Sequence, residues 1–95
     1  MVVQRAKAQR AVMSREAIVA SIELNLAHML PYSRWTVGLT TDADRSEMEH
    51  DLPAFWRYWH AQTPSDALAI VRQFADKGMK QGPPEGKDPT YVYMY

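Results

Sequence analysis

The sequence predicts a single domain of the α+β class, with a small antiparallel sheet of about three strands near residues 34–39, 55–61 and 90–95. Three observations support this prediction. The 95-residue chain is the usual length of one domain. Its 46% hydrophobic content is enough for one packed core. Helical patterns near residues 14–30, 42–51 and 64–77 alternate with the three β-prone segments, and the sequence has no internal repeat.

The first helix is predicted over residues 14–30. Ser14 can cap it, and Glu16 falls in the first turn, where the helix dipole favours a negative charge. Apolar residues recur at helical spacing along one face: Ile18, Ile22, Leu26, Met29 and Leu30. Pro31 ends the helix, because the residue before a proline avoids the helical conformation. We expect residues 1–13 to be frayed.

A short β-prone segment at residues 34–39 leads into the second helix. This segment contains Gly38, and residues 40–42 offer capping side chains for a helix over residues 42–51. Thr41 and Asp44 also have capping-box spacing. Pro53 ends this region.

The third helix has the clearest start in the sequence. It follows the aromatic segment at residues 55–61, which is predicted to be a strand. Thr63 is the predicted cap, Pro64 the first helical residue and Asp66 the capping-box partner. A glycine, Gly78, follows the predicted end at residue 77. Glycines and prolines then predict a mobile loop over residues 80–89, before the last strand at 90–95.

Composition excludes several classes of function. Eleven basic and eleven acidic residues cancel, so no overall charge draws the protein to nucleic acid or membrane. The chain has no cysteine, and its three histidines are far apart, so no metal site is predicted. No apolar run is long enough to cross a membrane, and the N-terminus is a poor match to a signal peptide. We therefore expect a cytoplasmic protein without a membrane partner.

Aromatic residues beside cations are the candidate binding residues. Trp56, Arg57 and Tyr58 are consecutive, and aromatic rings beside a cation can stack unpaired nucleic-acid bases. Aromatic residues in a strand of a small domain are more often part of the core. Trp35 and Tyr91 complete the candidate set. Tyr91 shares one strand face with two other tyrosines, a face that would serve as a binding surface, a subunit interface or the underside of a helix.

Residues 35–50 (WTVGLTTDADRSEMEH) resemble the second half of the GIY-YIG nuclease signature. In that signature a strand ends in a Tyr-x-Gly-like motif, a threonine-containing turn follows, and a helix carries arginines and a histidine. The spacing from Gly38 to His50 is similar, and the resemblance extends over residues 35–78. The family's first strand should come before Trp35, where a helix is predicted instead. Residues 91–93 (YVY) resemble that strand moved to the C-terminus, as in a circularly permuted relative. We therefore expect the final tyrosine-rich strand to lie inside the sheet, next to the segment that contains Gly38.

The resemblance implies a nuclease site in which three groups are replaced. Such nucleases use tyrosines near the attacking water, an arginine on the phosphate and a glutamate that holds a divalent metal. Tyr93 matches one tyrosine, whereas Thr36 stands at the other. Ser46 stands at the arginine position. Arg45 is one residue away and therefore points about 100° away from Ser46 around the helix. Val71 stands at the glutamate position. Without a carboxylate and a placed cation, hydrolysis is not expected.

We therefore expect a non-catalytic domain with a GIY-YIG-like fold that serves in binding or assembly. Tyr93, Arg45 and His50 remain the candidate catalytic residues for one alternative, a metal-dependent endonuclease in which Arg45 and Glu47 supply the missing groups. That alternative alone calls for magnesium, and no cofactor is otherwise predicted. A second alternative is a homodimeric interaction module unrelated to nucleases. The predicted partners are accordingly nucleic acid or a second copy of the chain.

Overall fold

The computed structural model describes residues 11–27 and 31–95. Three α-helices, a 3₁₀ helix and five strands follow one another in this order: β1 (Val12–Met13), α1 (Arg15–Leu26), η2 (Tyr32–Arg34), β2 (Thr36–Thr40), α2 (Ala43–Glu49), β3 (Arg57–Ala61), α3 (Pro64–Asp76), β4 (Lys80–Gln81) and β5 (Tyr91–Met94). The predicted α+β class with three α-helices is confirmed. The part of the first predicted helix at residues 28–30 lies outside the described residues.

The five strands form one mixed sheet in the order β1-β3-β5-β2-β4. β5 runs antiparallel to both neighbours, whereas β1 is parallel to β3 and β4 is parallel to β2. The predicted sheet of about three antiparallel strands is therefore imprecise: it describes the centre and omits both edges. Each edge strand has only two residues, too few to show any periodicity in the sequence.

The C-terminal strand lies at the centre of the sheet. Tyr93 pairs with Gly38 of β2 on one side and with Tyr58 of β3 on the other. The prediction that the final tyrosine-rich strand lies next to the segment containing Gly38 is confirmed. The last strand in sequence thus completes the sheet.

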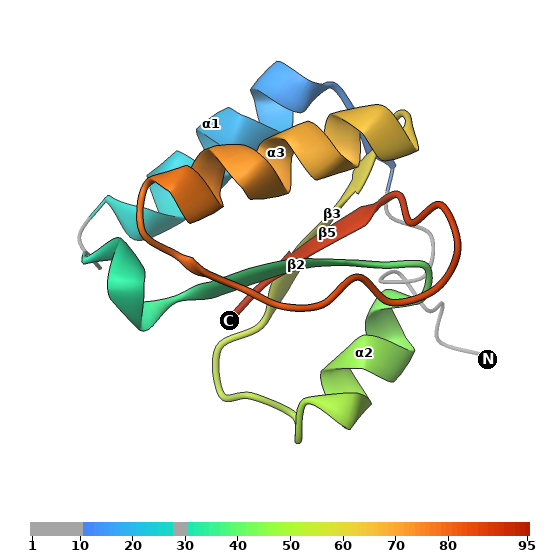
Figure 1. Cartoon of the computed structure of the whole chain (residues 1–95). Helices are drawn as coiled ribbons and strands as arrows, with labels where there is room; N and C mark the ends of the chain where they lie inside the picture. Colours follow the sequence, from blue (N-terminus) through green and yellow to red (C-terminus); the bar gives the residue numbers. More distant parts are fainter. Residues whose placement is uncertain (1–10, 28–30) are drawn as a thin grey trace, which may run out of the picture.

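Helices cover both faces of the sheet, as Figure 1 shows: α1 and α3 lie over one face and α2 lies on the other side. The first face carries the main core, to which the strands contribute Val37, Leu39, Trp59, Ala61, Val92 and Met94. The second face carries a smaller aromatic core made of Ala43, Trp56, Tyr58 and Tyr93, with Tyr91 and Tyr95 packed against it. Strand alternation explains the division, since neighbouring residues of a strand point to opposite faces.

Each α-helix is capped by a residue among those that the sequence offered. Ser14 accepts a hydrogen bond from the N–H of Ala17, and Thr63 accepts one from the N–H of Asp66. For α2 the cap among residues 40–42 is Asp42, which accepts from the N–H of Arg45. Because a carboxylate caps as well as a hydroxyl, local pattern alone did not separate these three candidates.

Two segments that we predicted to be irregular contain paired backbone. Residues 1–10 of the predicted frayed segment lie outside the described residues, but Val12–Met13 form β1 against His60 and Ala61. Within residues 80–89, β4 pairs with β2, and Glu85 forms an isolated bridge with Thr40. The N–H of Glu85 donates to the Leu39 carbonyl, and the Thr41 N–H donates to the Glu85 carbonyl. This loop is therefore hydrogen-bonded along the sheet beside β2.

Candidate functional site

On the second face, Glu85 of the loop between β4 and β5 contacts three other polar side chains. Its carboxylate accepts hydrogen bonds from the Ser46 hydroxyl and, at 3.4 Å, from the Tyr93 hydroxyl. Nε2 of His50 lies 2.9 Å from Oε2 of the same carboxylate. We call Glu85, its three partners, Thr40 and Tyr95 the Glu85 network. It joins the end of β2, helix α2, the loop and β5.

The direction of the hydrogen bonds within the Glu85 network follows from the number of protons available. An ionised carboxylate only accepts, so Ser46 donates its single proton to Glu85. Ser46 Oγ also lies 2.7 Å from Thr40 Oγ1. Thr40 Oγ1 accepts from the N–H of Asp42 at 3.1 Å and donates to the Asp42 carbonyl at 3.2 Å. Two hydroxyl groups therefore connect the N-terminal cap of α2 to Glu85.

His50 connects Glu85 to the C-terminal tyrosine. Nδ1 of His50 lies 3.0 Å from the Tyr95 hydroxyl, while Nε2 donates to Glu85. In a neutral ring Nδ1 accepts from Tyr95, and in a protonated ring it donates to the phenol oxygen, so both charge states keep both contacts. The side chains of His50 and Glu85 are 21% and 24% exposed, so solvent reaches the edge of the network.

The network changes the pKa of two of its members in opposite directions. Burial raises the pKa of Glu85, but hydrogen bonds from Ser46 and His50 together with the charge of His50 outweigh it, and the pKa lies below its usual value. Burial, with the nearby Glu85 charge, raises the pKa of Tyr93 well above its usual value. Glu85 is therefore ionised and Tyr93 is protonated at neutral pH.

Tyr93 lies in an aromatic stack that closes the second face. Its ring is stacked on Trp56 with centroids 5.0 Å apart and on Tyr95 with centroids 6.0 Å apart, and the ring itself is fully buried. It also crosses Gly38, where an added Cβ would lie 2.4 Å from Cζ of Tyr93. The glycine of the TVG motif therefore makes room for the tyrosine of the neighbouring strand.

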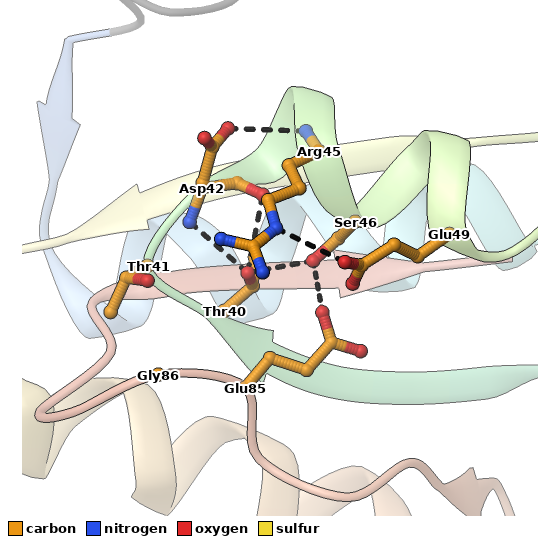
Figure 2. A pocket seen from close by; sticks show the side chains of 8 residues that line it. All are labelled: Thr40, Thr41, Asp42, Arg45, Ser46, Glu49, Glu85 and Gly86. Atoms are coloured by element: carbon orange, nitrogen blue, oxygen red, sulfur yellow. Dashed lines mark hydrogen bonds and ion pairs between the residues drawn. The ribbon is translucent and has the colours of Figure 1, made fainter.

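A small pocket of about 110 Å³ opens beside the Glu85 network (Figure 2). Its lining consists of Thr40, Thr41, Asp42, Arg45, Ser46, Glu49, Glu85 and Gly86. Nε of Arg45 lies 3.0 Å from the carboxylate of Glu49, and the Arg45 side chain is 75% exposed. Three carboxylates thus face one guanidinium, which makes the pocket a poor receptor for a phosphate group.

The residue that stands at the glutamate position of the nuclease signature lies elsewhere. Val71 belongs to α3 and is buried in the main core, whereas Tyr93 belongs to the aromatic core on the other face of the sheet. The structure therefore brings together Tyr93, His50 and Ser46, places Arg45 at the rim of the pocket, and separates Val71 from all of them. Glu49 lines the pocket, and Glu47 does not.

The candidate binding residues also divide between the two faces. Trp56 and Tyr58 are buried in the aromatic core, and Tyr91 is half-buried and stacked on His60 at 4.3 Å. On the other side, Trp35 contacts Phe55 edge-on with centroids 4.9 Å apart. The Arg57 guanidinium lies 4.6 Å from the centre of the same Phe55 ring. Trp35 and Arg57 therefore lie together on one side of the sheet, where both contact Phe55, and Trp56, Tyr58 and Tyr91 lie together on the other.

Sequence reasoning missed Glu85, the centre of the network. It is one acidic residue in a loop rich in glycine and proline, 39 positions after Ser46, and no spacing rule relates the two. The only local signal is the following Gly86, whose φ of 89° belongs to a turn that folds the loop back. An added Cβ at Gly86 would lie 2.4 Å from Thr41 Oγ1, so the loop packs closely against the turn after β2.

Two further searches cover the described part of the chain. Among residues 11–27 and 31–95, no group of three or more histidine, aspartate and glutamate side chains could hold a metal ion. Within the same ranges no helix has the length and apolar character needed to cross a membrane. Comparisons with protein-family models, with curated proteins and with solved structures find no match to this chain.

Proposed function

We propose that this protein is a non-catalytic binding domain with a permuted GIY-YIG-like fold. The observation that carries the proposal is the saturation of Glu85 by the protein itself. Its two carboxylate oxygens accept from Ser46, His50 and Tyr93, which are the residues at or near the positions that the nuclease resemblance would make catalytic. These groups stabilise the contact between α2, the loop and β5.

Hydrolysis of a phosphodiester needs side chains that reach the substrate, and the candidate side chains in this network are buried. Ser46 is 1% exposed and Tyr93 is fully buried beneath Trp56. Arg45 is the cation nearest to the network along α2, but it pairs with Glu49 and stands among three carboxylates. A developing negative charge at this pocket would meet repulsion in place of the stabilisation that catalysis requires.

The sheet supports the permuted resemblance on which the fold part of the proposal rests. Hydrogen-bonded pairing of β5 with β2 is independent of the order in which the chain supplies the two strands. The close approach of Gly38 and Tyr93 gives a physical reason for a glycine and a tyrosine at facing positions of such a pair.

A second candidate function, a magnesium-dependent nuclease, has one observation in its favour. Glu85 supplies a carboxylate on the same face as Tyr93, at the edge of a pocket that Arg45 also lines. In that case Glu85 would take the role left empty at Val71, and His50 would be the nearest proton carrier. A bound magnesium ion would then have to displace the hydrogen bond that Ser46 donates to Glu85.

Cleavage assays separate the two functions. Supercoiled plasmid and labelled single-stranded DNA are incubated with the protein and with magnesium at about 10-fold excess over EDTA, so that free metal ion is present. The binding-domain proposal predicts no product above the buffer control. Magnesium-dependent cleavage that disappears in Glu85→Gln, and persists in Glu49→Gln, would establish the nuclease instead.

A further inference from the structure

We infer that the basic N-terminal segment of this chain, residues 5–10, docks along the side of α2 that carries Asp44 and Glu47, which we call the acidic flank. The inference concerns a contact within the chain and does not depend on the proposed function. The acidic flank faces away from the pocket of Figure 2, whose lining includes neither Asp44 nor Glu47.

The acidic flank is more covered than the opposite side of the same helix. Ser46 and Ala43 are buried and mark the direction of the sheet. With 3.6 residues per turn, Asp44 and Arg45 each lie about 130° from that direction, on opposite sides of α2. The side chain of Arg45 is 75% exposed, whereas Asp44 is half-buried and its Oδ1 atom is buried. Position around the helix alone therefore does not explain the burial of Asp44.

A second pair of residues shows the same difference in exposure. Glu47 and Glu49 lie at similar angles from the sheet, Glu47 on the side of Asp44 and Glu49 on the side of the pocket. Glu47 is half-buried, whereas the side chain of Glu49 is 50% exposed. The difference extends over one turn of α2, so we infer that a segment of chain, and not one side chain, covers the acidic flank.

The acidic flank faces the edge of the sheet at which β1 lies. The pocket side of α2 faces Glu85, in the loop beside β2, and β2 and β3 lie on opposite sides of β5. The other side of α2 therefore faces β3 and, beyond it, β1. Ala43 agrees with this orientation, since it packs in the aromatic core with Tyr58 of β3. Among residues 11–27 and 31–95, β1 is the only strand beyond β3.

The strand register brings the start of β1 close to the start of α2. Val12 is paired with His60, and His60 is paired with Tyr91. Tyr91 is paired with Thr40, and α2 begins at Ala43. At about 4.8 Å between neighbouring strands, this row spans about 14 Å. A segment of ten residues extends to about 33 Å, so the residues that precede β1 reach the acidic flank.

The charges of the segment and the flank are complementary. Arg5, Lys7 and Arg10 are the only charged residues among the first ten. Asp44 and Glu47 are three residues apart in α2 and so are neighbours on the helix surface. Cations beside half-buried carboxylates offset part of the cost of removing those carboxylates from water. The same chain is the favoured source of these cations, because a tethered segment has an effective concentration on the order of millimolar.

A double-mutant cycle in the full chain tests this contact. The first variant neutralises the three cations of the segment: Arg5→Gln, Lys7→Gln and Arg10→Gln. The second neutralises the acidic flank with Asp44→Asn and Glu47→Gln, and the third combines all the changes. Urea denaturation at low salt should show a coupling of about two- to fivefold in the unfolding equilibrium constant, which is lost in about 1 M salt. Glu49→Gln on the opposite side of α2 is the control, and its effect should add to that of the first variant.

A spin label locates the segment independently of stability. Because the chain has no cysteine, Ala8→Cys provides one attachment site for a nitroxide. In an isotope-labelled chain the nitroxide should broaden the amide signals of α2 more than those of α3, which covers the other face of the sheet (Figure 1). Neutralising Asp44 and Glu47 should reduce the broadening of α2.

Three results would overturn the inference. Additive costs in the cycle would show that the cations of the segment and the acids of α2 do not interact. Equal broadening of α2 and α3 would show that the segment has no preferred position. Broadening of α2 only when spin-labelled chains are mixed with separate isotope-labelled chains would assign the acidic flank to a second copy of the protein.

Discussion

Nε2 of His50 lies 2.9 Å from Oε2 of Glu85, and this contact ties the end of α2 to the loop between β4 and β5. The two residues are 35 positions apart in the sequence. The same carboxylate receives the hydroxyl of the buried Ser46, so one side chain satisfies two donors of one helix. The loop is thereby fixed against the sheet beside β2.

Replacing Glu85 should destabilise the fold more than replacing any exposed acid of α2. Glu85→Ala leaves the donors of Ser46 and His50 without their acceptor, so the free energy of unfolding should fall by about 1–3 kcal/mol. The exposed pair of Arg45 and Glu49 is worth at most a few tenths of a kcal/mol, which makes Glu49→Ala the matched control. Urea denaturation of the three proteins measures the difference. Equal midpoints for the two variants would contradict the central role of Glu85.

Stability should depend on pH through Glu85 in a defined direction. Its pKa in the folded state lies below the ordinary value of 4.5, because hydrogen bonds from Ser46 and His50 outweigh the effect of burial. The unfolded state therefore binds a proton first as the pH falls. The stabilisation by Glu85 is complete above its unfolded pKa and is lost as the pH falls through its folded pKa.

The free energy of unfolding, measured between pH 3 and pH 7, should accordingly decline less steeply toward acid in Glu85→Gln than in wild type. Glu49→Gln serves again as the control and should follow the wild-type curve. Parallel curves for wild type and Glu85→Gln would mean that Glu85 titrates alike in both states.

Gly38 and Tyr93 should behave as a coupled pair. A Cβ at position 38 would overlap the ring of Tyr93, so Gly38→Ala should cost about 1–3 kcal/mol, as overpacking does. In a Tyr93→Leu background the ring is absent and the same substitution should cost distinctly less. A double-mutant cycle by urea denaturation measures this coupling. Additive costs would show that the strand pair tolerates an alanine without help from Tyr93.

The turn after α2 should gain stability from a residue that accepts a left-handed backbone. Leu52 has a φ of 49°, and its side chain is 64% exposed, so the fold gains little from its burial. Asparagine tolerates this conformation far better than leucine. Leu52→Asn should raise the free energy of unfolding by about 0.5–1 kcal/mol. Leu52→Ala, which shortens the side chain without easing the backbone, should show no such gain in the same thermal or urea experiment.

Much of the fold could be predicted because its signals are local. Ser14 and Thr63 cap their helices as the patterns indicated, and β2, β3 and β5 fall within or next to the predicted segments. The candidate site was predicted only in part. His50 and Tyr93 do meet, with ring centroids 5.3 Å apart, but no motif indicated Glu85, the carboxylate that both of them contact. Trp35 and Arg57 share a surface only because Phe55 lies between them.

The sequence by itself determined the α+β class, the three helices and the three central strands, because periodicity and capping act over a few residues. Tertiary structure alone decided the two edge strands, the central place of Glu85 and the division of the aromatic residues between two cores. Those features depend on which distant segments pack together. A two-residue strand or a lone loop carboxylate acquires its role only from the neighbour that the fold brings to it.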